Sequence, residues 1–179
     1  MEIADLMLHP VRLRIVHAGM DGLPFTTSQL CARLPDISKA TIYRQVAVLV
    51  DGGMVEVVGE ERVRGAVERT YRLHTSRTSI DAAAMSNADH ERGFAAAIGA
   101  LIAEFNVYVG RPEANPLADS VSYRQFSLWL TEEEKAAFIE EMAVAIRARM
   151  TNPPAPERRR HLASTILFPA DSLADTAAT

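Results

Sequence analysis

Apolar and polar positions alternate at helical spacing over the start of the chain and predict four short helices. Pro10 fits best in a first helical turn. Thr26 and Gln29 have the spacing of a capping box, with Phe25 and Leu30 as its hydrophobic staple. The predicted helices are Ile3–Leu8, Pro10–Met20, Thr27–Leu34 and Ser38–Asp51. The last two are joined by a tight turn, which is a helix-turn-helix arrangement.

The fourth helix has two faces of opposite character. Ser38 is a natural N-cap, and the two glycines after Asp51 end the helix. One face recurs at helical spacing and must be buried: Ile42, Val46, Leu49 and Val50. The outer face is short and rich in hydrogen-bond donors: Lys39, Thr41, Tyr43, Arg44 and Gln45. A helix that reads base edges in the major groove of DNA needs such a face; an ordinary solvated surface is the alternative.

After Gly53 the pattern becomes strand-like. Met54–Val58 is rich in valine, and Val67–Leu73 alternates, so residues 54–73 predict a β-hairpin wing. Its glycine-bounded tip carries Arg62 and Arg64, which we expect to contact phosphates. A tip kept soluble by its charge is the alternative. For Arg12, Arg14 and Arg69 a solvated face is an equally good interpretation.

The second part of the chain begins with a Ser/Thr/Ala-rich linker at residues 75–85. Asn87–Val109 then predicts one long helix with apolar residues spaced 4, 3, 4 and 3 apart: Phe94, Ile98, Leu101, Phe105 and Tyr108. This spacing is typical of a coiled-coil seam, and we interpret it as a dimerisation surface. A core stripe within one chain is the alternative.

A strand–helix–strand pattern follows. Val121–Leu130 and Leu162–Phe168 are the predicted strands, and Thr131 begins an acidic helix between them. The sequence leaves open whether the strands pair within one chain or across a dimer. Five aromatic residues are candidates for an effector pocket or for a plain hydrophobic core: Phe105, Tyr108, Tyr123, Phe126 and Trp129. Residues 169–179 predict a disordered tail.

Charge and composition narrow the functional classes. The net charge of the 179 residues is −4, and the negative excess lies after residue 75, so DNA binding requires a local basic face. Cys31 is the single cysteine, which excludes an internal disulfide and a cysteine-cluster metal site. No apolar run approaches the roughly 20 residues of a membrane helix, and the first residues lack a secretory signal. We therefore expect a cytoplasmic protein without a membrane partner.

Catalytic motifs are absent from the sequence. It contains no glycine-rich phosphate loop, G-x-S-x-G, H-E-x-x-H or C-x-x-C pattern. The histidines show no metal-ligand spacing. We expect no enzyme activity, no cofactor and no metal.

The segments LHPVRLRIVHAG and SQLCARLPDISKATIYRQVAVLVDGGMVEVV, with the hairpin after them, resemble the winged helix-turn-helix of ArsR-type bacterial transcriptional regulators. The resemblance covers roughly residues 4–74, and its most specific part runs from Ser38 to Val55. It implies that the outer face of the fourth helix enters the major groove and that Arg62 and Arg64 reach the DNA backbone or minor groove. The paired cysteines of the metal-sensing members are missing, which argues against metal sensing.

Together these observations predict a mainly α fold with a small β component. Residues 1–75 form a winged helix-turn-helix, and residues 76–168 form a dimerisation region with room for a small-molecule effector of unknown identity. The predicted function is a homodimeric transcriptional regulator that reads a pseudo-palindromic site in double-stranded DNA. The alternative is a protein-interaction module whose winged helix docks a protein partner.

Overall fold

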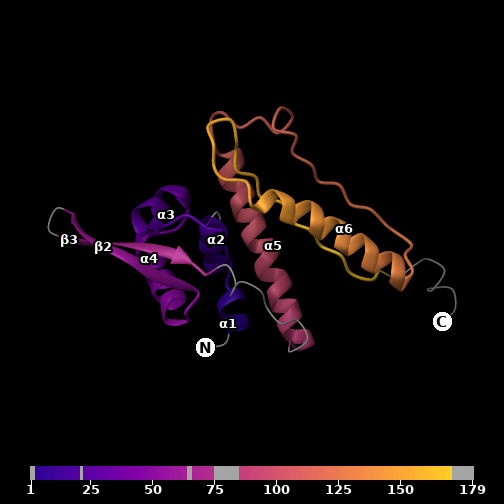
Figure 1. The fold of residues 1–179 in the computed structure, drawn as a ribbon, viewed down its shortest axis with the longest axis horizontal. Coiled ribbons are helices and arrows are strands. Elements are labelled where there is room, and N and C mark those ends of the chain that lie inside the picture. The colour runs from indigo at the N-terminus through magenta and orange to yellow at the C-terminus, as the bar shows by residue number, and fades with distance from the viewer. Residues whose placement is uncertain (1–2, 21, 64–65, 75–84, 171–179) are drawn as a thin grey trace. The chain divides into compact units, whose positions relative to one another are not determined.

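Four helices and a small sheet make up the first part of the chain (Figure 1). The computed structural model describes residues 3–20, 22–63, 66–74 and 85–170. The helices are α1 (Ile3–Met7), α2 (Pro10–Gly19), α3 (Thr27–Arg33) and α4 (Lys39–Asp51). The strands are β1 (Phe25–Thr26), β2 (Val55–Val63) and β3 (Ala66–Leu73). The predicted helix-turn-helix and hairpin are therefore confirmed as elements of the fold.

Side chains cap these helices as the sequence predicts. Thr26 and Gln29 form the capping box of α3, and the Ser38 hydroxyl accepts a hydrogen bond from the Thr41 amide at the start of α4. The cap of α2 is His9, whose Nδ1 accepts from the Val11 amide at 3.2 Å. Each cap satisfies an amide that the first helical turn leaves without a partner.

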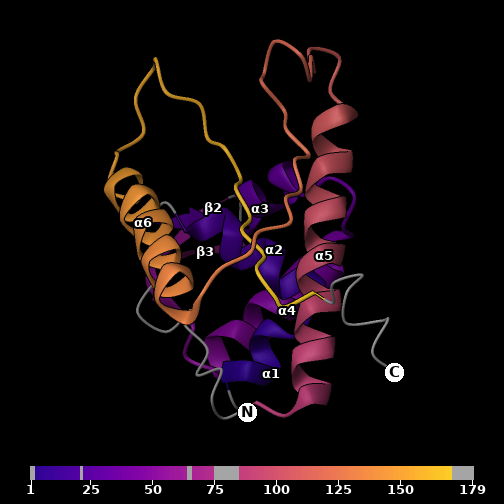
Figure 2. The same ribbon diagram turned by 90° about the vertical axis from the view of Figure 1, so that its right-hand side faces the viewer.

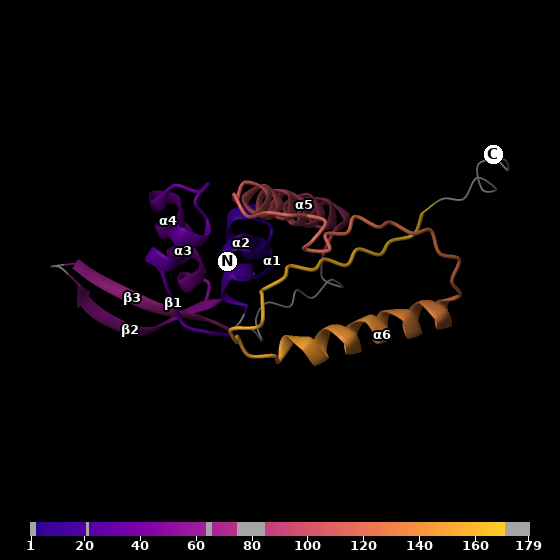
Figure 3. The same ribbon diagram turned by 90° about the horizontal axis from the view of Figure 1, so that it is seen from above.

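The sheet is antiparallel in the order β1-β3-β2, and its hairpin projects beyond α3 and α4 (Figure 3). Val57 pairs with Tyr71 and Gly59 with Thr70, so Val58 is an extra residue in β2. The sequence analysis missed β1, because two residues are too short to show a strand period. Phe25 pairs with Tyr71, and their rings stack with centroids 6.1 Å apart.

The core lies between the helices and the sheet. Ile42, Val46 and Leu49 are buried as predicted, and Val50 is half-buried against them. Leu6 of α1 is fully buried at the end of α4. A Cβ on Gly52 would lie 2.3 Å from Leu6 Cδ1, so only glycine lets α1 approach this closely.

The long helix α5 (Asn87–Val109) begins at a capping box of Ser86 and Asp89 and lies along α2 (Figure 2). Its buried residues are Ala96 and Ala100. The predicted apolar seam lies elsewhere on the helix. Phe94 is exposed, and the other four seam residues are half-buried: Ile98, Leu101, Phe105 and Tyr108. Small side chains, which allow close approach, therefore form the buried contact of α5.

Length and composition alone would allow α5 to cross a membrane, and among the described residues no other helix meets this test. This corrects the expectation that the sequence holds no such segment. The run was overlooked because alanines and glycines supply much of it.

The last helix, α6 (Glu132–Met150), begins as predicted. The Thr131 hydroxyl accepts from the Glu134 amide, and the Glu134 carboxylate accepts from the Thr131 amide. No residue of α6 is buried. The chain divides into two compact units, Met1–Lys135 and Ala136–Thr179. The predicted functional boundary near residue 75 and most of the predicted tail lie outside the described residues.

The two strands predicted after α5 are wrong. Residues 121–130 and 162–168 are described, and neither segment forms a strand. Their alternating pattern would suit a strand, but a strand also needs a neighbouring strand to bond its backbone groups. In the described parts of this single chain neither segment has one, and most of their apolar side chains are exposed.

Candidate nucleic-acid interface

The outer surface of α4 carries most of the residues singled out by the sequence. The side chains of Lys39, Tyr43 and Arg44 are exposed, and that of Thr41 is half-buried. Ser38 at the N-cap is also exposed, and its Oγ lies 2.9 Å from Thr41 Oγ1. A tyrosine, an arginine and a lysine therefore project from one capped helix, and their role in DNA contact remains a prediction.

Gln45 does not lie on this outer surface, contrary to the sequence prediction. Its side chain is 6% exposed, and its Oε1 accepts a hydrogen bond from Arg12 Nη1 at 3.2 Å. Position 45 follows Ile42 by three residues and precedes Leu49 by four, which places it beside the buried stripe. Gln45 therefore fastens α4 to α2, and the same spacing in the sequence could have revealed this.

Arg12 is a structural arginine that the sequence analysis did not identify. Its Nε donates to the Leu6 carbonyl at 2.7 Å, and its Nη2 donates to the Asp5 carbonyl at 2.6 Å. These carbonyls belong to the C-terminal part of the short helix α1, where the helix dipole also interacts favourably with a cation. Arg12 thus joins α1, α2 and α4 through one guanidinium group.

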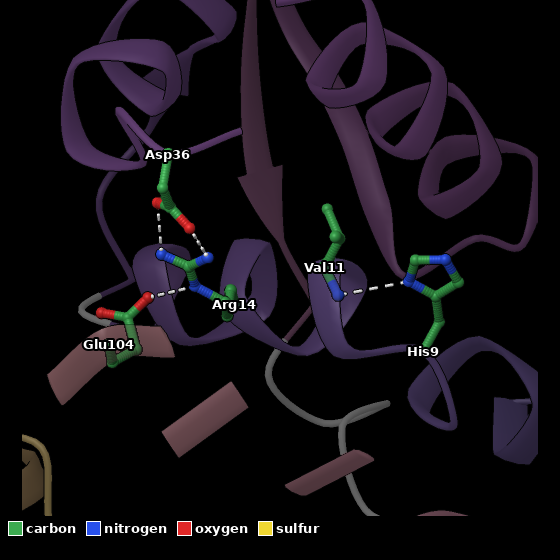
Figure 4. Close-up of polar contacts among 5 residues, drawn as sticks. All are labelled: His9, Val11, Arg14, Asp36 and Glu104. Atoms are coloured by element: carbon green, nitrogen blue, oxygen red, sulfur yellow. Dashed lines mark hydrogen bonds and ion pairs between the residues drawn. The ribbon is translucent and has the colours of Figure 1, made fainter. Parts of the chain in front are cut away.

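His9 connects the start of α2 with the charges near α4. Burial, assisted by the charges of Arg12 and Arg44, lowers the pKa of His9, although an interaction of the imidazole with the backbone of His9 itself opposes the shift. The neutral form is the one required, because Nδ1 accepts the hydrogen bond from the Val11 amide (Figure 4). The electrostatic field of Arg44 therefore reaches the cap of α2.

Arg14 is buried, with a side chain 3% exposed, and not solvated. Its guanidinium makes two hydrogen bonds to Asp36, in the turn between α3 and α4, and one to Glu104 of α5 (Figure 4). The hydrogen bond from Arg14 lowers the pKa of Asp36, although burial opposes it. Arg14 and Glu104 are the functional candidates that the sequence analysis missed, because partners this distant leave no local signal.

The hairpin carries mixed charge. Arg62 is exposed on β2 as predicted, whereas Arg64 lies outside the described residues. Arg69 Nε lies 2.7 Å from Glu60 Oε1, and Arg72 Nη1 lies 3.8 Å from Glu56 Oε1. The positive charges of two wing arginines, Arg69 and Arg72, are therefore offset by neighbouring glutamates.

The remaining sequence candidates do not assemble into a second site. Phe105 contacts Tyr108 and Tyr123, with ring centroids 5.9 Å apart in both pairs, but Phe126 and Trp129 are exposed. Cys31 packs against the core. No group of three potential metal-binding side chains occurs in the part of the chain that the structure describes.

Comparison with known families bears on the α4 surface. Residues 7–58 match a helix-turn-helix domain of an ArsR-like family, which indicates DNA binding and is typically found in transcription factors without enzyme activity. The match runs from the end of α1 into β2, so it includes α4 and leaves the rest of the chain unassigned. No curated protein of known function matches the sequence.

Proposed function

We propose that this protein is a cytoplasmic transcriptional regulator that binds specific sites in double-stranded DNA as a homodimer. The observation that carries the proposal is the exposed surface of α4, where Lys39, Tyr43 and Arg44 project from the second helix of a helix-turn-helix domain. Arginine recognises guanine with two hydrogen bonds in the major groove, and an aromatic or methyl group can contact thymine methyls. Arg44 is our first choice for a base contact.

The wing adds sequence-independent affinity in this proposal. Arg62 is exposed on the projecting hairpin, a position suited to a phosphate contact. Phosphate contacts fix the position of the domain on the duplex and make binding sensitive to salt.

A homodimer would present two copies of α4 to two half-sites about one DNA turn apart, roughly 34 Å. Exposed apolar side chains on α5 support a second subunit: Phe94, Ile102 and Val109. An effector would regulate the protein only if it preferred one spacing of the two domains over another.

The first test is selection of genomic DNA fragments by the purified protein at two salt concentrations. We expect a two-fold-related sequence motif to be enriched and the affinity to fall steeply with added salt. Failure to enrich any motif, without salt-dependent binding, would contradict the proposal and favour a module that docks a protein partner.

The substitution Arg44→Ala then tests whether the exposed surface of α4 contacts bases. We expect a loss of about 1–3 kcal/mol in binding free energy and a relaxed preference at one base pair. Arg124→Ala removes the same charge at an exposed position outside the matched domain and serves as the control. An equal loss on all sequences would make Arg44 a phosphate contact instead.

A further inference from the structure

Arg14 lies where three segments distant in the sequence meet. It belongs to α2, and its partners are Asp36, in the turn before α4, and Glu104 of α5. Nη1 and Nη2 bind the two Asp36 oxygens at 2.5 and 2.8 Å, while Nε binds Glu104 Oε1 at 2.8 Å. Figure 4 shows the two carboxylates at different edges of the same guanidinium plane.

This geometry makes the two carboxylates depend on each other. A buried cation is tolerated only when it is paired and hydrogen-bonded, and Arg14 is 3% exposed. The guanidinium is rigid and planar, so turning it toward one partner moves the donors that face the other. The hydrogen bond that Arg14 donates to Glu104 therefore helps to fix the orientation in which Arg14 holds Asp36.

Asp36 is close to the start of the proposed DNA-reading helix. It lies two residues before Ser38, the N-cap of α4, and the intervening Ile37 amide donates to the Leu34 carbonyl at 3.1 Å. The turn is thus short and internally bonded. A displacement of Asp36 would be passed to the first turn of α4, which carries Lys39 and Thr41.

We propose that Arg14 is a positioning residue through which α5 controls the placement of the DNA-reading helix. This inference rests on the proposed function and extends it, because it assigns Glu104, far along the chain from α4, a role in sequence-specific affinity. Coupling between two sites is reciprocal, so operator binding also strengthens the contact between Glu104 and Arg14. Anything that moves α5 against α2 would change DNA affinity by this route.

The test compares Glu104→Gln with Glu91→Gln in the full chain. Both substitutions remove one negative charge from α5, and Glu91 is exposed. We expect Glu104→Gln to weaken binding to the selected operator about five-fold or more, in the range usual for coupled sites. Binding to unrelated DNA at the same salt should stay unchanged, because phosphate contacts remain, and Glu91→Gln should match the unmodified protein.

Arg14→Lys separates positioning from a general structural role. Lysine keeps the charge but cannot make the forked contact with Asp36. If Arg14 transmits the effect, Glu104→Gln should weaken operator binding much less in the Arg14→Lys background than in the unmodified protein. Thermal unfolding of each variant ensures that affinities are compared only between folded proteins.

Four results would contradict the proposal or its basis. Equal losses on operator and unrelated DNA, or a lower melting temperature with unchanged operator affinity, would reduce Arg14 to a structural ion pair. Additive effects of Glu104→Gln and Arg14→Lys would show that Arg14 does not mediate the coupling. If the unmodified protein enriches no operator at all, the proposed function fails, and this inference fails with it.

Discussion

The segments before and after residue 75 both contain many apolar side chains, but they bury them very differently. Apart from Ala96 and Ala100, all buried apolar residues of the described chain lie between Leu6 and Leu73. Helix α4 has 13 residues and buries Ile42, Val46 and Leu49, whereas α6 has 19 residues and buries none. The first segment therefore has a core of its own, and the second does not.

This difference indicates where the second segment obtains its stability. Burial of apolar surface is the main favourable term in folding, at about 25 cal/mol per Å². Trp129 is 83% exposed and Phe126 is 75% exposed, so in the single chain the burial of these two side chains contributes little to the free energy of folding. Large exposed apolar side chains that lie close together usually mark an interaction surface. The expected second subunit would provide a surface to cover them.

The largest predicted effect comes from leucine-to-alanine substitutions in the two segments. Leu49 is fully buried, so Leu49→Ala should lower the free energy of unfolding by about 2–5 kcal/mol. Leu128 is 50% exposed, so Leu128→Ala should change it by less than about 0.5 kcal/mol under dilute, monomeric conditions. Denaturant unfolding followed by circular dichroism measures both.

If Leu128→Ala lowered the free energy of unfolding as much as Leu49→Ala does, the two segments would not differ in burial as the structure indicates. Such a loss would show that residues 121–130 are buried in solution. If that loss grew with protein concentration, a second subunit would be the covering surface.

A smaller effect is expected at the cap of α2. The pKa of His9 is lower in the folded protein than its ordinary value of 6.5, so the unfolded chain binds more protons and stability rises with pH. The cap is fully present above about pH 6.5 and is lost as the pH falls through the folded-state pKa, at a cost of about 0.5–2 kcal/mol. Asn is also a good N-cap but does not titrate.

Unfolding free energies of the unmodified protein and of His9→Asn, measured from pH 8 to pH 5, check this prediction. The difference between the two proteins should shift in favour of His9→Asn as the pH falls. A constant difference would mean that His9 protonation does not affect the cap.

The smallest effect is expected at the cap of α5, in the second segment. Hydrogen bonds from Ser86 and Arg92 lower the pKa of Asp89 from 3.8 to about 2. The folded state therefore favours the carboxylate, and this contribution is full above about pH 3.8 and is lost only toward pH 2.

Hydrogen exchange of the amides at residues 86–90 checks this prediction in the unmodified protein and in Asp89→Ala. The difference in protection should be slight and constant from pH 8 to pH 4. A difference that is already falling markedly at pH 4 would show that Asp89 titrates near its ordinary pKa of 3.8.

Local signals in the sequence predicted much of the first segment. Ser38, Thr26 and the glycines after Asp51 mark helix ends by their own backbone chemistry, so the helix limits followed from them. Tyr71 and Leu73 identified the buried side of β3 by alternation alone. These features depend on neighbours within a few residues.

Features that depend on distant partners were not predictable in this way. The partners of Arg14 are 22 and 90 residues away in the sequence, and hydropathy assigns an arginine to the surface. The segments at 121–130 and 162–168 have strand-like patterns, but a pattern does not supply the neighbour that a strand must bond to. Gln45 lies between these two cases of predictability, because its spacing in the sequence indicated burial while its polarity indicated exposure.

The extra residue Val58 determines how charge is distributed over the two sides of the hairpin. Opposite residues of an antiparallel pair lie on the same side of the sheet, and every second residue returns to it. Beyond the bulge, Arg62 is opposite Val67 and Glu60 is opposite Arg69, on the side shared by Tyr71 and Leu73. Glu61 and Glu68 are opposite each other on the reverse side.

If Val58 paired with Thr70 instead of being an extra residue, the register would run straight, and Glu61 would take the place of Arg62 opposite Val67. Because of this bulge, one side of the outer hairpin carries Arg62, Arg69 and Glu60, and the other side carries Glu61 and Glu68 opposite each other. The first side can approach an anionic surface, and the second is repelled by it. The bulge thus gives a ribbon of balanced charge a preferred orientation.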